Sequence, residues 1–181
     1  QLFITGSHED VHIGVGIADT LDILVCHLPS RLNGRQSARL RHRVASFMRS
    51  AVDSLCASRV IPRIVVMGDF NDIPTSHALS PLVLDDGLVC ITKDLKGSYR
   101  YKGRWEQIDH LYLSPALVDS TQKLHLTPSG AWVTSEEFLT EPEPLYGGFR
   151  PKRTYNGMRY QGGVSDHLPV CFDLQFSWDD Y

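Results

Sequence analysis

Side chains that can bind a metal ion or move a proton stand where several apolar stretches of this sequence end. In "RIVVMGDFNDIP", residues 63–74, an apolar run leads into Gly68, and Asp69 and Asn71 follow it closely. Such residues also form ordinary turns after strands, so this motif alone is more typical of turn chemistry than of catalysis. The same placement recurs along the chain, at His27, at Asp69 with Asn71, at Asp109, and at Asp166 with His167. This recurrence predicts that the polar groups converge on one shared site.

The residue types in this set predict hydrolysis of a phosphate ester. Carboxylates gathered in one place repel one another unless a cation joins them, and hard oxygen ligands favour Mg²⁺ or Mn²⁺ over zinc. His167 is a candidate general base that takes a proton from water, and Asp109 is the candidate carboxylate that fixes its tautomer. Asn71 and His27 can donate hydrogen bonds to oxygens that gain charge in a transition state. Together these groups fit metal-assisted attack of water on phosphorus.

The hydrophobic pattern predicts the elements that must position this set. They are a buried strand over Thr20–Leu28, an amphipathic helix over Gln36–Arg59, a strand covered on both faces over Arg63–Gly68, a hairpin within Ser98–Leu113 that turns at Lys102-Gly103, and a last strand over Leu168–Phe176. Residues 127–163 are polar and rich in Gly and Pro, so we expect a long loop with a short helix near Ser135–Leu139. This order predicts an α/β or α+β fold in a single domain over residues 1–181.

Composition sets the class of protein. The 181 residues are 42% hydrophobic, which is ordinary for a globular protein with a substantial core. No apolar run approaches the ~20 residues needed to cross a bilayer, so we expect no membrane span. The net charge of −3 gives no global attraction for nucleic acid, and binding to a polyanion would need a local basic patch. The four cysteines are widely spaced, which predicts free, mostly buried thiols and no clustered zinc site.

Two further residues are candidates for substrate contact. Arg31, in "HLPSR", follows His27 closely, and a guanidinium can bind two phosphate oxygens at once. Trp105 lies in the predicted hairpin and could stack on a base or a sugar, although aromatic residues in hairpins more often belong to cores. The other arginines after His27 are typical of the solvated face of a helix.

The sequence also contains a formal match to a zinc-protease signature, "HEDVH", in which His8, Glu9 and His12 have the H-E-x-x-H spacing. That motif binds zinc only on a helix, where both histidines lie on one face. Gly6, Gly14 and Gly16 surround it closely. We therefore interpret the match as a polar turn between two strands, with a zinc metalloprotease as a less favoured alternative.

Four segments in this order resemble one known family. "LVCHLPSR", "VVMGDFND", "QIDHLYLS" and "SDHLPV" are similar to the motifs of the endonuclease/exonuclease/phosphatase superfamily, over roughly residues 20–176. The resemblance implies a four-layered αββα sandwich of two mostly antiparallel sheets, with the site where strand ends converge. It also implies a Mg²⁺- or Mn²⁺-dependent hydrolase, either a nuclease or a phosphatase.

The resemblance implies roles for individual residues. Asp166 would help to hold the metal, His167 would be the base, and Asp109 would orient it. Asp69 would position the attacking water or assist the leaving group, with a share of metal binding. Asn71 would hold the phosphate oxygens, and His27 would bind the phosphate as well.

The resemblance also predicts that the chain corresponds to the C-terminal two-thirds of the family domain, incomplete at its N-terminus. The family carries an Asn and a metal-binding Glu in an earlier segment, and no matching segment precedes residue 20. We therefore expect the partners of this chain to be a phosphate-ester substrate, with nucleic acid among the options, and either the missing segment or a second copy of the chain. The alternative to an enzyme is a catalytically silent relative that uses the same fold for binding.

Overall fold

The computed structural model describes residues 20–84 and 87–177, and its centre is a four-stranded sheet. The strands are β1 (Leu21–His27), β2 (Arg63–Asp69), β6 (Asp109–Leu113) and β3 (Val89–Cys90), and they lie in the order β1-β2-β6-β3. β1 and β2 are parallel, whereas β6 is antiparallel to both of its neighbours. The first four residues of β2 are buried, which confirms the prediction of a strand covered on both faces.

One face of this sheet is covered by α1 (Arg35–Ser58), which follows the 3₁₀ helix η1 (Arg31–Asn33). A second 3₁₀ helix, η2 (His77–Leu82), packs against α1. The helix contributes Ala45, Met48 and Val52 to the core cluster on this face, at steps of three and four residues. That periodicity correctly predicted the helix, and its bounds are right to within one residue at each end.

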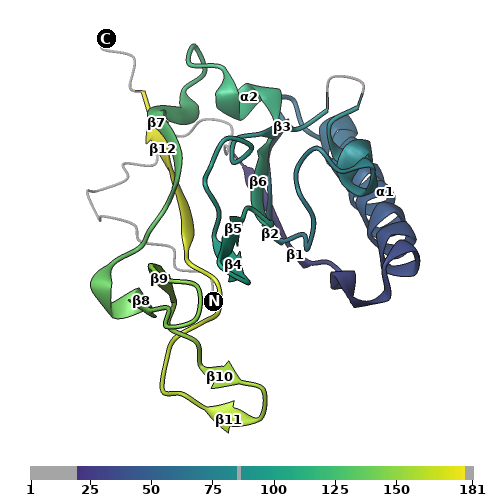
Figure 1. Ribbon diagram of the computed structural model, residues 1–181. Helices are drawn as coiled ribbons and strands as arrows, with labels where there is room; N and C mark the ends of the chain where they lie inside the picture. The colour runs from purple at the N-terminus through teal and green to yellow at the C-terminus, as the bar shows by residue number, and fades with distance from the viewer. Residues whose placement is uncertain (1–19, 85–86, 178–181) are drawn as a thin grey trace.

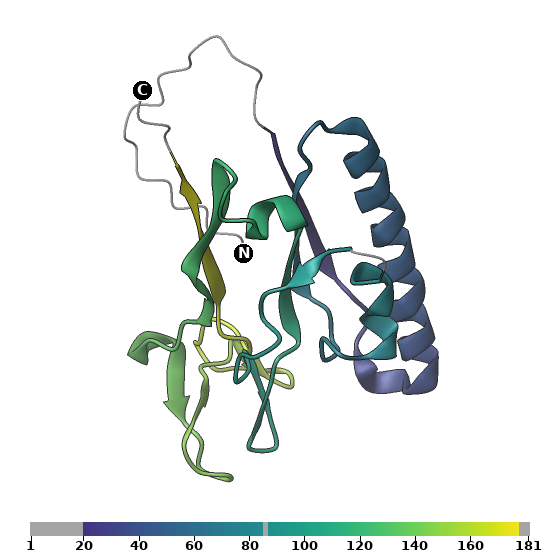
Figure 2. The same cartoon turned by 90° about the horizontal axis from the view of Figure 1, so that it is seen from above.

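The other face of the sheet packs against an antiparallel pair, β7 (Leu124–Val133) and β12 (Val170–Phe176). The short helix α2 (Pro115–Val118) lies between β6 and β7 in the chain. Val65, Leu111 and Leu113 form the apolar cluster between the two sheets, together with partly buried residues of β7 and β12. Figures 1 and 2 show the three resulting layers in order, with α1 on one side, the four-stranded sheet in the middle and the β7–β12 pair on the other side.

The segment over residues 127–163, predicted to be a loop, contains most of a long strand and several short ones. The first residues of this segment belong to β7. Two small hairpins follow: β8 (Thr140–Pro142) pairs with β9 (Phe149–Pro151), and β10 (Tyr155–Asn156) pairs with β11 (Arg159–Tyr160). The prediction of a loop is therefore wrong for these residues. The 3₁₀ helix η3 (Glu137–Leu139) confirms the short helix expected there.

The predicted hairpin within Ser98–Leu113 is present, but it is shorter than expected. β4 (Tyr99–Tyr101) pairs with β5 (Arg104–Glu106), and the turn is at Lys102 and Gly103, both with positive φ. Glycine adopts this backbone conformation at little cost, so it marks the turn correctly. β6 leaves the hairpin and joins the central sheet, where it can carry Asp109 to the strand ends.

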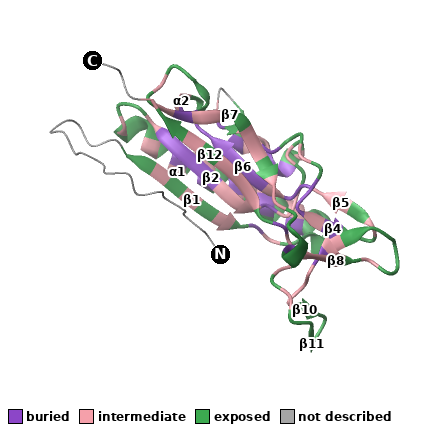
Figure 3. Ribbon diagram, turned by 90° about the vertical axis from the view of Figure 1, so that its left-hand side faces the viewer, coloured by how far each residue is buried: buried purple, intermediate pink, exposed green. Residues whose placement is uncertain are grey.

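β1 is less buried than its apolar sequence predicted. Leu21, Ile23 and Val25 are exposed and share the sheet face of Val65 and Met67, because they pair in register with β2. Figure 3 shows this alternation along β1, in contrast to the buried β2 and β6. Within the described part of the chain, the β7–β12 pair covers β2 and β6 and leaves the same face of β1 open to solvent.

All four cysteines are free, as expected, but none is fully buried: Cys56 is exposed and the other three are half-buried. The expectation of mostly buried thiols is therefore wrong. Among the described residues, no helix has the length and apolar character needed to cross a membrane.

Candidate active site

The ends of three adjacent strands place three candidate site residues in a row. The register of β1 and β2 sets His27 beside Asp69, and the register of β2 and β6 sets Asp69 beside Asp109. Nε2 of His27 lies 3.4 Å from Oδ2 of Asp69, and the His27 side chain is 77% exposed. The row therefore forms an accessible edge on which a solvent-borne ligand can reach the carboxylates.

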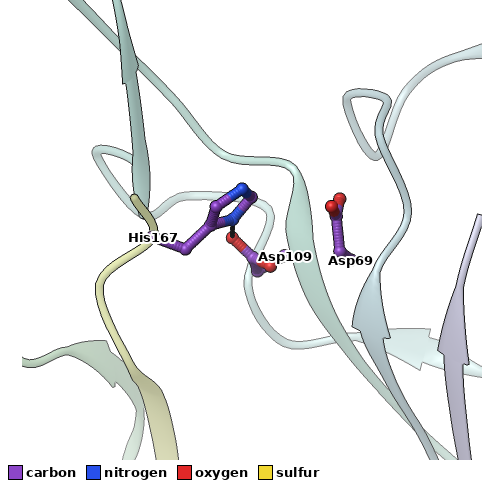
Figure 4. Close-up of side chains that lie close together, drawn as sticks. All are labelled: Asp69, Asp109 and His167. Carbon is purple, nitrogen blue, oxygen red and sulfur yellow. Dashed lines mark hydrogen bonds and ion pairs between the residues drawn. The ribbon is translucent and has the colours of Figure 1, made fainter. Parts of the chain in front are cut away.

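His167 joins this row from the other sheet. It lies on the short connection before β12, and its Nδ1 is 2.6 Å from Oδ2 of Asp109. Ligand atoms of Asp69, Asp109 and His167 all lie within 4.8 Å of one another. In the view of Figure 4, Asp109 stands between the other two and is joined to His167 by a hydrogen bond. These side chains are 19–23% exposed, so the cluster is largely shielded and still reachable.

Residues at the start of β4 hold His167 in place. Tyr99 forms a backbone bridge with His167, and the two rings lie 4.8 Å apart. The buried Ser98 donates its hydroxyl to Oδ2 of Asp109, and its carbonyl accepts a 2.8 Å hydrogen bond from the amide of Leu168. Sequence reasoning missed both residues. The available signal was their position at the start of the hairpin that precedes Asp109 in the chain.

Burial and neighbouring charges shift the pKa of two site residues. Burial raises the pKa of Asp69; the backbone amide of Asn71 opposes this, while the nearby Asp109 charge adds to it. Burial alone would lower the pKa of His167, but the hydrogen bond and charge of Asp109 outweigh it, with help from Asp69 and Asp166, so that the pKa is raised. The site thus has an excess of negative charge that a cation would relieve.

Asn71 braces Asp69 in this structure. Its backbone amide donates to Oδ1 of Asp69 at 2.8 Å, and its Nδ2 donates to Oδ2 of Asp69 at 2.9 Å and to the carbonyl of Leu28 at 3.0 Å. Asn71 has φ of 51°, a left-handed conformation that Asn tolerates better than most residues. Its amide hydrogens point to Asp69 and to the loop after β1, so the residue fixes the carboxylate as well as lining the site.

An ion pair that the sequence did not indicate ties the loops around the site together. Arg41 of α1 is 4% exposed and lies 2.8 Å from Oδ2 of Asp72. Its Nη1 also donates to the carbonyls of Pro29 and Ser30, at 3.1 and 3.3 Å. The helix thereby fixes the loop after β1 and the loop after β2. The periodicity of α1 gave no reason to separate Arg41 from its solvated neighbours.

The remaining candidates lie around the cluster. Asp166 is exposed and acts on the pKa of His167, but it is not among the three residues whose ligand atoms group together. Arg31 forms an ion pair with Glu106 of β5. Trp105 of β5 has the Arg100 guanidinium 5.5 Å from its ring. The H-E-x-x-H match at residues 8–12 lies outside the described residues.

The donor set fits a hard divalent cation. Asp69 and Asp109 offer carboxylate oxygens side by side. Among the residues that the structure describes, their side-chain partners are histidine, hydroxyl and amide groups, with no ion pair to Lys or Arg. Mg²⁺ and Mn²⁺ prefer such oxygen ligands. His167 keeps Nε2 on the far side of the ring from its Asp109 hydrogen bond, where it can accept a proton.

Comparison with known proteins places this geometry in context. A family model described as Endonuclease/Exonuclease/phosphatase family matches residues 10–176. Among solved structures, the chain is similar to a protein of that family from Bacteroides thetaiotaomicron, with 17% identity and a TM-score of 0.54, over 86% of this chain and 50% of that one. No match was found among curated protein sequences.

Two other structures have a similar fold. One is a mannosyl-6-phosphatase from Bacteroides thetaiotaomicron, with 18% identity and a TM-score of 0.52, over 85% of this chain and 51% of that one. The other is the catalytic domain of human nocturnin, with 18% identity and a TM-score of 0.52, over 86% of this chain and 47% of that one. The chain therefore spans about half the length of the structures that it matches.

Proposed function

Because the chain belongs to the endonuclease/exonuclease/phosphatase family, we propose that it hydrolyses phosphate esters in a metal-dependent reaction, with His167 as the general base. Members of this superfamily are metal-dependent phosphoesterases. The observation that carries the proposal is the 2.6 Å contact between His167 and Asp109 beside the Asp69 carboxylate. A binding protein of the same fold would have no need to keep a base and its orienting carboxylate together.

The proposed roles follow from the positions of the donor atoms. Asp109 accepts from Nδ1–H of His167, which leaves the lone pair of Nε2 free to take a proton from water. Asn71 and Ser98 hold the carboxylates of Asp69 and Asp109 in place. Mg²⁺ or Mn²⁺, when bound, would neutralise charge on the phosphate oxygens, with Asp69 and Asp166 as its proposed ligands.

Substrate contacts are proposed for three residues. The exposed His27 stands beside Asp69 and can donate to a phosphate oxygen. Arg31, which forms an ion pair with Glu106, would release this carboxylate and bind the phosphate, because a guanidinium binds either anion. Trp105 would stack on a base or a sugar. Mannosyl-6-phosphatase and nocturnin share the fold, and the ester of this protein is proposed as a phosphomonoester or a phosphodiester.

The proposal includes parts beyond the described residues. A four-layered αββα sandwich would add an outer layer of helices to the β7–β12 pair. The Asn and the metal-binding Glu implied by the family would come from a preceding segment or from a second copy of the chain. The Glu would add a charged ligand for the metal ion. Asp69 and Asp166 alone would bind Mg²⁺ weakly, because Mg²⁺ requires several oxygen ligands in near-octahedral array.

The test is hydrolysis by the full-length protein of DNA, RNA, sugar phosphates and lipid phosphodiesters, after chelation and after return of Mg²⁺ or Mn²⁺. On a substrate that is cleaved, His167→Ala should lower kcat by roughly 10²–10⁴-fold without loss of folding, and Asp109→Asn should cost less. His77→Ala is the control, because His77 is an exposed histidine that stacks on His42 outside the site. Metal-independent turnover, or full turnover by His167→Ala, would refute the proposal. Binding of an ester without hydrolysis would favour the alternative, a catalytically silent relative that uses the same fold for binding.

A further inference from the structure

A basic hollow lies between the β4–β5 hairpin and the segment around β9. Its volume is about 380 Å³, and the cations that line it are Arg100, Lys102, Arg150 and Arg153. The hairpin tip closely approaches the opposite wall, since a Cβ added at Gly103 would lie 2.7 Å from Cβ of Tyr146. The two walls are also joined by hydrogen bonds from the Arg100 guanidinium to the carbonyls of Gly147 and Phe149.

Charge in this hollow is unbalanced. Glu143 is the acidic residue of its lining, and it pairs with Arg150 at 3.4 Å; Arg150 also pairs with Glu141, outside the lining, at 2.8 Å. Within the described part of the chain, the other three cations have no carboxylate partner: Arg100 donates to backbone carbonyls of Gly147 and Phe149, and Arg153 donates to the carbonyl of Arg100. The whole chain carries a net charge of −3, so this positive cluster is local. Cations held together without counterions favour binding of an anion.

The hollow is connected to the candidate base through one aromatic ring. The guanidinium of Arg153 lies 5.8 Å from the centre of the Tyr99 ring, and that ring lies 4.8 Å from the ring of His167. Lys102 is exposed at the hairpin tip, with its ammonium group 5.3 Å from the Tyr101 ring. Arg153, one of the cations of the hollow, is therefore linked to the ring of the candidate base by two successive ring contacts.

We propose that this hollow is a subsite for a second phosphate group of the substrate, bound by Lys102 and Arg153, with the buried Arg100 adding positive charge. The inference rests on the proposed function, because it extends the substrate from the same site. The shared chemistry is an anionic phosphate oxygen. It is supplied either by a neighbouring phosphate of a single-stranded polynucleotide or by the second phosphate of a small bisphosphate.

The experiment measures binding without turnover, in excess chelator. One arm titrates the full-length protein into a fluorescent single-stranded oligothymidylate and follows anisotropy at several salt concentrations. The other compares a sugar bisphosphate with its monophosphate by calorimetry. The variants are Lys102→Gln, Lys102→Arg as the charge-conserving rescue, and Lys93→Gln as the control, since Lys93 is exposed and does not line the hollow.

With the polynucleotide as ligand, Lys102→Gln should weaken binding about 10-fold, which equals ~1.4 kcal/mol. It should also lower the slope of log K against log salt by about 0.7, the value for one phosphate contact on a single strand. With a bisphosphate as ligand, the preference over the monophosphate should fall by a similar factor. Lys102→Arg should restore most of the affinity in whichever arm responds.

The result that overturns the subsite is equal affinity of Lys102→Gln and Lys93→Gln for both ligands. This outcome is distinct from failure of the proposed hydrolysis, because the binding assay contains no free metal and records no turnover. Binding that depends on Lys102 without any hydrolysis would retain the subsite and refute the catalytic proposal.

Discussion

Replacement of Arg41 by alanine should destabilise the fold strongly, although Arg41 lies on a helix rich in exposed arginines. Its side chain is 4% exposed, and its Nε and Nη2 lie 3.0 and 2.8 Å from Oδ2 of Asp72. The substitution also removes the donors to Pro29 and Ser30. Removal of one partner of a buried ion pair typically costs about 3–5 kcal/mol. The Asp72 carboxylate is 15% exposed, so water can reach it, and we expect about 3 kcal/mol.

Urea unfolding measures this loss. With an m-value of about 2 kcal/mol/M, a loss of ~3 kcal/mol lowers the midpoint by about 1.5 M. The control is Arg43→Ala, which truncates an exposed arginine two residues away and should change stability by less than about 0.5 kcal/mol. In the double variant Arg41→Ala with Asp72→Ala, the cost should be clearly smaller than the sum of the single costs. Equal midpoints for Arg41→Ala and Arg43→Ala would refute the structural role of the ion pair.

Three other changes test the described geometry. Gly68→Ala should lower the melting temperature by about 10 °C in circular dichroism, because the new Cβ would lie 1.9 Å from the carbonyl oxygen of Cys26; an unchanged melting temperature would contradict that packing. Asp22→Asn should cost about 1 kcal/mol at neutral pH, and this difference should shrink as the pH falls below 3.8, since the hydrogen bond from Arg59 holds the pKa of folded Asp22 below that usual value. A pH-independent difference in urea midpoints would argue against this. Burial raises the pKa of Cys26 to about 12, so a thiol reagent should modify the exposed Cys56 first, as read by mass spectrometry of peptides.

The periodicity of the sequence correctly predicted those elements that are specified by residues close together in the chain. The helix α1, the strand β2 and the turn at Lys102-Gly103 follow from patterns within short windows. β7 was missed because Pro128 and Gly130 interrupt its apolar pattern, and the strand is stabilised by pairing with β12, whose residues are distant in the chain. Tertiary contacts override weak local preference in such strands.

The same distinction applies to the site. Asp69, Asp109 and His167 were predicted as site residues from their residue types and their positions at strand ends. The structure places their ligand atoms within 4.8 Å of one another. The supporting groups were not predictable in this way. Ser98 and Arg41 act through contacts across 11 and 31 residues with Asp109 and Asp72; Ser98 is marked only by its place before the hairpin, and nothing in the immediate sequence marks Arg41. The roles of the three clustered residues in catalysis stay predictions.

The separation of Asp109 and His167 on two sheets has a consequence for the order of folding. Asp109 ends β6 of the central sheet, whereas His167 precedes β12 of the other sheet, and 58 residues separate the two in sequence. Contacts over such distances form late, because the entropy of closing the intervening chain is lost before the contact stabilises anything. The parallel strands β1 and β2, which α1 connects, pair residues that are 42 positions apart in sequence, and this separation is shorter. A refolding chain should therefore complete its central sheet first and gain the hydrogen-bonded Asp109–His167 pair only when the β7–β12 pair docks.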